Sequence, residues 1–329
     1  MSVLEVRNLS IEFAQHRGKK FRAVDNVSFS LEAGRTLALV GESGSGKSTI
    51  ARTLSRLMSP TSGELFLHGE KVGRRGSATR TYRRSVQMVF QDPFASLNPA
   101  FSVDHHLRRP LAIHGQKKAG MTDAIHNLLR SVNLTPAEVI ANKFPHELSG
   151  GQRQRVAIAR ALAPQPEVIL ADEPVSMLDV SVRLEILNLL ESIKRDRNLA
   201  ILYITHDLAT ARHFSDEILV MFRGEIVERG RTDDVILAPA HPYTKLLANS
   251  VPSRSTKGKV VAATTAREMG NEVIADDAER SESFATTGCP FRYRCPSAMD
   301  ICRDLPEEVS VGDSHRVRCW LHIPAHREK

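Results

Sequence analysis

The chain has 329 residues, of which 41% are hydrophobic and 25% charged, and its formal net charge is +7. This balance is typical of an ordinary folded protein. No run approaches the roughly 18 apolar residues that would cross a bilayer, and the first residues lack the basic head and apolar core of a signal peptide. We therefore expect the protein to stay in the cytosol and to meet a membrane only through a partner.

The positive charge is compatible with nucleic acid, anionic lipid or phosphate-bearing ligands and selects none of them. The densest basic segment, residues 71–84, lacks the repeated aromatic side chains of a stacking surface for single strands. A solvated face accounts for it more simply, and we expect no nucleic-acid partner.

Strand patterns dominate the beginning of the chain. Residues 3–13 and 24–31 alternate apolar and polar side chains, as half-buried antiparallel strands do. Residues 36–40 are instead a continuous apolar run, which is typical of a strand buried on both faces. A helical pattern follows over residues 47–58, and residues 65–68 form another alternating strand.

Strands and helices alternate in the rest of the first 230 residues. Residues 103–165 are mostly helical, and the buried strands 168–171 and 200–204 flank a helical stretch at 181–194. This alternation indicates a parallel sheet covered on both faces. Residues 218–228 are predicted to form a terminal hairpin.

The segment after the first buried strand fits the phosphate-binding loop, in which Gly-Lys-Ser follows a glycine by four residues. Glycines there let successive N–H groups point at phosphate oxygens, and the next helix adds the positive end of its dipole. Lys47 can reach the terminal phosphates, and Ser48 can ligate Mg²⁺. A flexible turn is the alternative, but the strand before and the helix after are the required context. The predicted ATP-binding loop comprises Gly41, Glu42, Ser43, Gly44, Ser45, Gly46, Lys47, Ser48 and Thr49.

Two adjacent acids follow the buried strand 168–171. The end of that strand is expected to lie beside the phosphate loop, where Asp172 can hold Mg²⁺ through water. Glu173 is then placed to orient and polarise an attacking water. The alternative is that both acids merely cap the next helix.

Residues 148–155, Leu-Ser-Gly-Gly-Gln-Arg-Gln-Arg, resemble the signature of the ATP-binding cassette (ABC) family. Ser149 can cap a helix, and two glycines let exposed N–H groups approach an anion. An ordinary capped helix is the alternative. In that family the anion is the γ-phosphate of ATP bound by the opposite subunit. The resemblance implies this contact for Ser149, Gly150, Gly151 and Gln152.

The resemblance assigns further roles by motif. Gln91 matches the glutamine that senses Mg²⁺ and faces the membrane subunit, Asp179 the loop that crosses the dimer interface, and His206 the contact to the γ-phosphate. The family stacks adenine on an aromatic residue, for which Phe13 is the first candidate and Phe21 the second. Glu173 and His206 would be the catalytic residues, and Mg²⁺ would be held through Ser48, Gln91 and Asp172.

The implied fold is α/β: a P-loop NTPase with a RecA-like parallel sheet, an antiparallel β subdomain, a helical signature subdomain and a small cysteine-rich tail. We expect an ATPase domain at 1–250, a linker at 251–288 and the tail at 289–329. Residues 91–99 and 241–245 resemble motifs of the oligopeptide/dipeptide importer branch, in its second type of ATPase subunit.

All four cysteines lie in the tail, with gaps of five, six and sixteen residues between them. Zinc ribbons favour two-residue gaps, whereas a four-thiolate iron–sulfur cluster suits wider ones. Free thiols and disulfides remain alternatives, although a reducing cytosol disfavours disulfides. The resemblance to the importer branch implies a structural [4Fe-4S] cluster held by Cys289, Cys295, Cys302 and Cys319.

Together these features imply ATP hydrolysis that powers uptake of peptides or a related small solute. The implied partners are a second ABC ATPase subunit in a heterodimer, two transmembrane permease subunits and an extracytoplasmic solute-binding protein, with this chain on the cytoplasmic face of a bacterial inner membrane. One alternative is a soluble ABC ATPase of DNA repair or translation, although those proteins fuse two cassettes or insert long coiled coils. Another is an importer for nickel or an opine.

Overall fold

A computed structural model describes residues 2–14, 20–73, 77–249 and 288–323. The predicted linker therefore lies outside the described residues except for its last position. Within the described ranges, no helix is both long enough and apolar enough to cross a membrane.

An eight-stranded sheet forms the centre of the molecule, with the strand order β11-β12-β10-β9-β3-β8-β7-β6. Strands β9, β3, β8, β7 and β6 run parallel to one another. Strands β10, β12 and β11 extend the sheet beyond β9 with antiparallel pairing. Every residue of β3, β7 and β8 is buried, as their continuous apolar sequences predict. The bounds are β3 Thr36–Val40, β6 Val86–Val89, β7 Val168–Asp172, β8 Ala200–Thr205, β9 Glu217–Phe222, β10 Glu225–Arg231, β11 Val309–Ser310 and β12 Arg316–Val317.

A second, four-stranded antiparallel sheet has the order β2-β1-β4-β5. Its apolar face shares one hydrophobic core with α1 and with one face of the central sheet. Alternation of apolar and polar residues in β1 and β2 is what makes this one-sided burial possible. The strands are β1 Ser2–Ala14, β2 Lys20–Glu32, β4 Ser62–Leu67 and β5 Glu70–Lys71.

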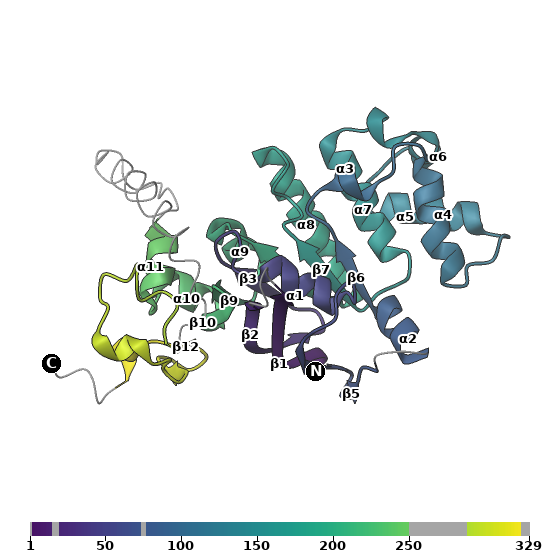
Figure 1. Cartoon of the computed structure of the whole chain (residues 1–329). Helices are drawn as coiled ribbons and strands as arrows, with labels where there is room; N and C mark the ends of the chain where they lie inside the picture. Colours follow the sequence, from purple (N-terminus) through teal and green to yellow (C-terminus); the bar gives the residue numbers. More distant parts are fainter. Residues whose placement is uncertain (1, 15–19, 74–76, 250–287, 324–329) are drawn as a thin grey trace, which may run out of the picture.

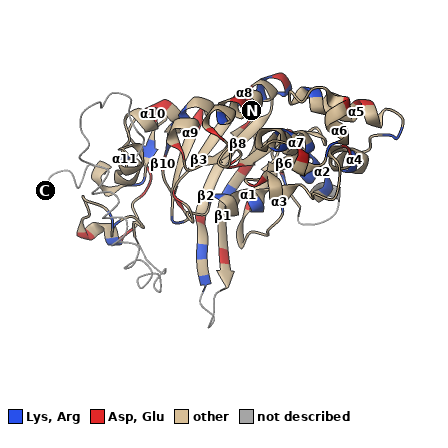
Figure 2. Ribbon diagram, turned by 90° about the horizontal axis from the view of Figure 1, so that it is seen from above, with Lys and Arg blue, Asp and Glu red and all other residues tan. Residues whose placement is uncertain are grey.

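Short helices form a subdomain at one end of the sheet, and the C-terminal elements lie at the other end (Figures 1 and 2). The helices from α4 to α7 pack around a core that also includes apolar residues of α8 and of β7, and α3 lies against α7. The helices are α1 Lys47–Leu54, α2 Ser77–Ser85, α3 Pro93–Ser96, α4 Val103–Ile113, α5 Met121–Ser131, α6 Ala137–Asn142, α7 Gly150–Leu162, α8 Val180–Arg197, α9 Leu208–Phe214, α10 Thr232–Leu237 and α11 Pro242–Asn249.

The predicted hairpin of β9 and β10 is present, but it is not the edge of the sheet. Strand β12 pairs antiparallel with β10, aligning Glu228 with Val317 and Arg229 with Arg316, and β11 pairs with β12. A hairpin strand leaves its outer row of N–H and C=O groups unpaired, so a later segment can satisfy them. The tail also contains the 3₁₀ turns η3 Asp300–Arg303 and η4 Trp320–His322.

Candidate functional site

The predicted phosphate loop joins β3 to α1 at the carboxyl edge of the parallel sheet. Gly46 precedes the helix with φ 106°, in the left-handed region that glycine tolerates. A Cβ at this position would lie 2.3 Å from the carbonyl oxygen of Ala23, so no side chain fits. The loop therefore needs glycine here for both its backbone conformation and its close packing against β2.

Lys47 lies inside the loop and is only 5% exposed. Its Nζ donates to the carbonyl oxygens of Gly41 and Glu42, both at 2.7 Å. Burial lowers the pKa of Lys47, while the carboxylates of Glu173 and Asp172 act in the opposite direction. The ammonium group is thus held at the centre of the loop by backbone acceptors.

Ser48 and Asp172 meet at the start of α1. The Ser48 Oγ donates to Asp172 Oδ1 at 2.9 Å, and the Asp172 residue is 4% exposed. Burial raises the pKa of Asp172, and the hydrogen bond from Ser48 opposes the rise. A hydroxyl and a desolvated carboxylate are hard oxygen ligands, and a divalent cation would favour the charged form of the acid, so the pair fits Mg²⁺.

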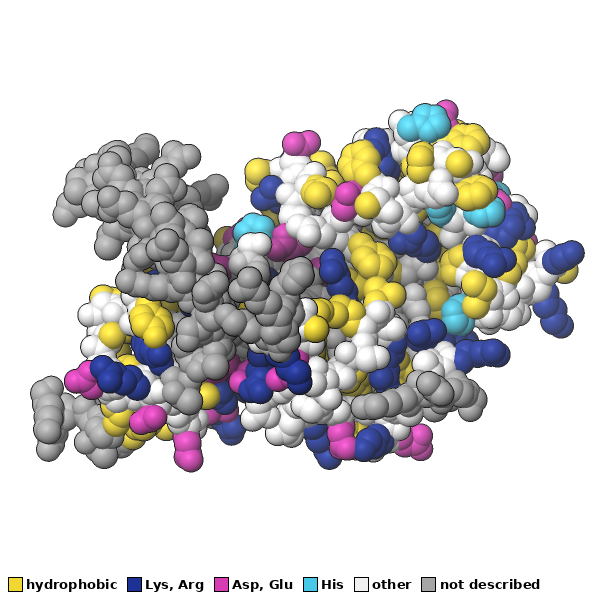
Figure 3. Space-filling model, in the orientation of Figure 1, with side chains coloured by type: hydrophobic (Ala, Val, Ile, Leu, Met, Phe, Trp, Pro, Cys, Tyr) yellow, Lys and Arg dark blue, Asp and Glu magenta, His cyan; other side chains and the backbone are white. Residues whose placement is uncertain are grey.

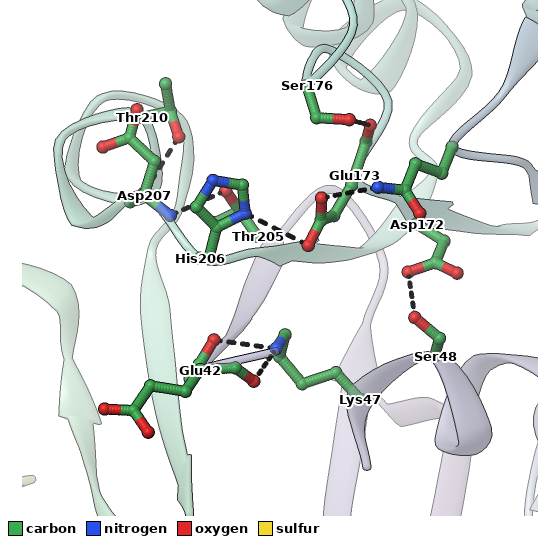
Figure 4. A network of polar contacts seen from close by, with 12 residues as sticks. Glu42, Lys47, Ser48, Asp172, Glu173, Ser176, Thr205, His206, Asp207 and Thr210 are labelled. Atoms are coloured by element: carbon green, nitrogen blue, oxygen red, sulfur yellow. Dashed lines mark hydrogen bonds and ion pairs between the residues drawn. The ribbon is translucent and has the colours of Figure 1, made fainter. Parts of the chain in front are cut away.

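Glu173 is contacted by two of the other predicted residues (Figure 4). Gln91 Nε2 donates to one carboxylate oxygen at 2.9 Å, and His206 Nδ1 lies 3.1 Å from the other. Glu173 has φ 44°, and its N–H donates to the carbonyl oxygen of Ile204 at 2.9 Å. Elements far apart in sequence, β6, β7 and β8, therefore converge on this carboxylate.

The signature residues lie next to the loop that carries Asp179. Ser149 caps α7 by accepting from the N–H of Gln152 at 3.2 Å, and the Gln152 side chain accepts from the N–H of Ser149 at 3.1 Å. A Cβ on Gly151 would come within 2.8 Å of Val182 on α8. Asp179 precedes α8 without capping it through its side chain. The predicted dimer contacts are thus grouped together at the junction of α7 and α8.

Phe13 is 38% exposed near the end of β1. It stands directly opposite Phe21 of β2 in the strand register, so the two aromatic candidates form one cross-strand pair. Both lie on the antiparallel sheet rather than in the phosphate loop itself.

A cleft of about 920 Å³ opens beside Gln91. Helices α1, α4 and α7 line it with basic side chains, and β6 and the residues after it contribute Met88 and Phe90. On one face of the molecule, Lys and Arg side chains gather over the half that contains α2 and α4 (Figure 3). The lining arginines are Arg52, Arg56, Arg83, Arg109 and Arg160.

The four cysteines line one small cavity together, and none forms a disulfide. Burial raises the pKa of the Cys289 thiol to about 12 and that of Cys319 to about 11, and it also raises that of Cys295. Among the described residues, no three His, Cys, Asp or Glu side chains are arranged to hold a single metal ion. An iron–sulfur cluster does not require the four sulfurs to surround a single ion, because each cysteine sulfur binds a different iron.

Two contacts to the phosphate loop come from residues whose part the sequence did not indicate. Arg294 donates to both carboxylate oxygens of Glu42, at 2.9 and 3.1 Å, and the Tyr243 Oη accepts the Glu42 N–H at 2.8 Å. Tyr243 lies within the motif at 241–245, and that motif is the only feature of the sequence that draws attention to either residue. Nothing near Arg294 in the sequence points to Glu42.

The parallel sheet, the glycine loop around Lys47 and the carboxylates at the neighbouring strand end define a P-loop nucleoside triphosphatase. The family described as "ABC transporter" matches residues 24–176, and "Oligopeptide/dipeptide transporter, C-terminal region" matches residues 227–302. The chain belongs to the ATP-hydrolysing subunits of ABC transporters, in the branch with an oligopeptide/dipeptide transporter C-terminal region.

Named relatives extend along nearly the whole chain. It is 40% identical to the oligopeptide transport ATP-binding protein AppF of Bacillus subtilis (strain 168), over 98% of both chains. It is 39% identical to the di/tripeptide transport ATP-binding protein DppF of Pseudomonas aeruginosa (strain UCBPP-PA14), over 97% of both.

Solved structures share the ATPase fold. The cbiO1 structure from Clostridium perfringens, described as part of the transporter complex cbiONQ, superposes with a TM-score of 0.64 at 26% identity, covering 72% of this chain and 91% of that one. The ATP-binding cassette MJ0796, as a dimer bound to ADP and Pi, gives 0.62 at 29% identity, covering 70% and 98%. The predicted fold class is confirmed.

Proposed function

We propose that this chain hydrolyses ATP to drive the uptake of peptides, as the ATPase subunit of an importer. The observation that carries the proposal is the convergence of Gln91 and His206 on Glu173, beside a phosphate loop. The chain is also similar to peptide-transport ATP-binding proteins over nearly its full length. Uptake of a related solute such as nickel or an opine is the second candidate, because solute-binding proteins and permeases select the solute.

Each residue has a distinct task in the proposed mechanism. The loop N–H groups and Lys47 bind the phosphates, and Ser48 and Asp172 would hold Mg²⁺, with Gln91 as its third ligand. Glu173 orients and polarises the attacking water. His206 stabilises the γ-phosphate, and Phe13 stacks on adenine. When bound, Mg²⁺ would neutralise the charge that develops on the phosphates.

The signature residues act across a dimer interface. We propose that Ser149, Gly150, Gly151 and Gln152 bind the γ-phosphate held by a second ATPase subunit, while Asp179 crosses the interface. Their grouping at the junction of α7 and α8, beside Asp179, supports this role. A different ATPase subunit is the proposed partner, which makes the assembly a heterodimer.

The remaining partners would be two transmembrane permeases and an extracytoplasmic solute-binding protein. The cleft beside Gln91 is a suitable docking place for a permease, because its lining includes Gln91 as well as basic and apolar side chains. Movement there would be transmitted directly to Glu173. The chain would then work on the cytoplasmic face of a bacterial inner membrane.

The cysteine tail, residues 289–329, is proposed to carry a structural [4Fe-4S] cluster. The support is the convergence of Cys289, Cys295, Cys302 and Cys319 on one cavity, with three of the four buried. The cluster would cross-link the tail and keep its thiolates deprotonated. Iron and acid-labile sulfide analysis of anaerobically purified protein should find about four of each per chain. Zinc, or no metal in a folded preparation, would contradict the cluster.

Glu173→Gln tests the ATPase mechanism. We expect the variant to bind ATP normally and to lose hydrolysis about a hundred- to thousandfold, which corresponds to about 2.7–4 kcal/mol of barrier. Steady-state phosphate release and equilibrium ATP binding measure the two quantities. Glu70→Gln, an exposed change of the same chemistry on β5, is the control and should leave both unchanged. Near-normal turnover of Glu173→Gln would remove Glu173 from the mechanism.

A further inference from the structure

Two residues from the C-terminal part of the chain hold Glu42, the second residue of the phosphate loop. Arg294 pairs with the Glu42 carboxylate through two parallel hydrogen bonds, at 2.9 and 3.1 Å. Tyr243 accepts the Glu42 backbone N–H at 2.8 Å. Side chain and backbone of Glu42 are therefore both fixed, by residues 252 and 201 positions away.

Glu42 in turn holds the lysine of the loop. The carbonyl oxygen of Glu42 accepts a hydrogen bond from Lys47 Nζ at 2.7 Å, while the N–H of Glu42 donates to Tyr243. The peptide group before Glu42 is bound to Tyr243 through its N–H and to Lys47 through the Gly41 carbonyl, and the peptide group after Glu42 is bound to Lys47. A contact path leads from Arg294 through Glu42 to the ammonium group that reaches the phosphates.

The two holding residues are themselves firmly placed. Tyr243 is fully buried, and its ring centroid lies 4.6 Å from that of Phe222 and 5.5 Å from that of Phe291. Its backbone N–H donates to His241 Nδ1 at 3.0 Å. The Arg294 guanidinium lies 5.8 Å from the ring centroids of both Phe222 and Phe291. Within the motif at 241–245, Tyr243 is thus a buried residue that contacts the phosphate loop.

We propose that Arg294 and Tyr243 are positioning residues for ATP binding, and that the C-terminal segment thereby completes the phosphate site. Arg294 fixes the Glu42 side chain and neutralises its charge close to the place where phosphates bind. Tyr243 fixes the adjoining peptide group. The inference rests on the proposed ATPase function and adds a role for a segment outside the ATPase motifs.

Substitution of Arg294 and Glu42 in the full-length chain tests the path. We expect Arg294→Ala to raise both the Kd and the KM for MgATP by about three- to tenfold, as for loss of a partly exposed bidentate pair, with kcat within about twofold of wild type. Arg294→Lys keeps the charge but loses the planar fork, so it should recover only part of the affinity. Glu42→Ala removes the pair together with the charge that Arg294 neutralises, so it should raise the Kd less than Arg294→Ala does. The double variant should be no worse than Arg294→Ala.

The control is Arg303→Ala, which removes an arginine of the same tail from an exposed pair with Asp300 at 3.7 Å. It should leave the Kd for MgATP unchanged.

Tyr243→Phe keeps the buried ring and removes the hydroxyl that accepts the Glu42 N–H, so it should raise the Kd for MgATP, as Arg294→Ala does. Thermal unfolding of every variant separates loss of folding from loss of affinity.

Wild-type affinity in Arg294→Ala, or additive effects in the double variant, would overturn the inference. A wild-type chain that binds MgATP but does not hydrolyse it would instead contradict the proposed function. The Kd comparisons would still decide the role of Arg294 in that case.

Discussion

Glu173 shows how the site depends on the conformation of a single residue. Its φ of 44° is sparsely populated for a residue with a side chain, and such conformations cluster at functional sites. Here the turn delivers the carboxylate to Gln91 and His206. The order Asp172-Glu173 in the sequence predicts two acids at a strand end, but not the two side chains that Glu173 meets.

Glu225 presents a second residue-scale effect, far from the phosphates. Its side chain is 12% exposed, and its Oε2 lies 3.6 Å from Arg318 Nη1. Among the residues that the structure describes, this oxygen has no hydrogen-bond partner. Burial raises the pKa of Glu225 to about 7, while the charge of Arg318 opposes the rise. The folded state therefore favours the protonated acid.

The sign of the resulting pH dependence follows from that rise. The stabilising contribution of Glu225 is fully present below 4.5, the ordinary pKa of a glutamate side chain, and is lost as the pH rises through about 7. Glu225→Gln should thus raise the free energy of unfolding by about 1–3 kcal/mol at pH 8, and the gain should vanish near pH 4.5. Urea unfolding over this range measures it.

A matched substitution lies on the neighbouring strand. Glu217 of β9 is exposed and pairs with Arg35 at 3.4 Å, so Glu217→Gln should change the free energy of unfolding by less than about 1 kcal/mol at every pH. A Glu225→Gln variant that is less stable than wild type at pH 8 would show instead that the pair with Arg318 outweighs the cost of burying the charge.

At the scale of elements, caps and glycine turns set where helices begin and end. Helix α7 begins at the capping box of Ser149 and Gln152, a pattern visible in the sequence. Helix α1 ends at Leu54, four residues before the end predicted from the apolar pattern. Arg56 adopts φ 60° just beyond it, which a continuing helix cannot contain.

Ser149→Ala separates capping from catalysis. Loss of the cap should lower the free energy of unfolding by about 1 kcal/mol. Ser102 caps α4 in the same way, accepting from the N–H of His105 at 3.4 Å, so Ser102→Ala should cost a similar amount. ATP hydrolysis by the assembled dimer should fall at least about tenfold in Ser149→Ala only, because only Ser149 is proposed to contact a γ-phosphate. Equal hydrolysis in the two variants would contradict that contact.

At the scale of the whole molecule, the tail is built into the ATPase sheet. Strand β12 extends that sheet at β10, and tail residues Phe291 and Cys302 share a hydrophobic core with β3 and β9. Glu228, fully buried on β10, accepts from the N–H groups of Ala240 and His241 and lies 2.6 Å from His315 Nε2. Packed side chains therefore join the cysteine region to β3, the strand that leads into the phosphate loop.

Local patterns in the sequence determined much of this protein. The continuous apolar runs predicted β3, β7 and β8, and the glycine loop predicted the turn around Lys47, because each depends on neighbouring residues alone. The class of enzyme followed from motifs of the same local kind.

Tertiary structure decided the contacts that join distant segments. The pairing of β12 with β10 and the hydrogen bonds of Arg294 and Tyr243 to Glu42 link residues up to 252 positions apart. No periodicity encodes such partners, since an arginine on a tail has the same local sequence whether it faces solvent or a carboxylate. The folded sheet brings these groups together, and burial then makes each contact specific.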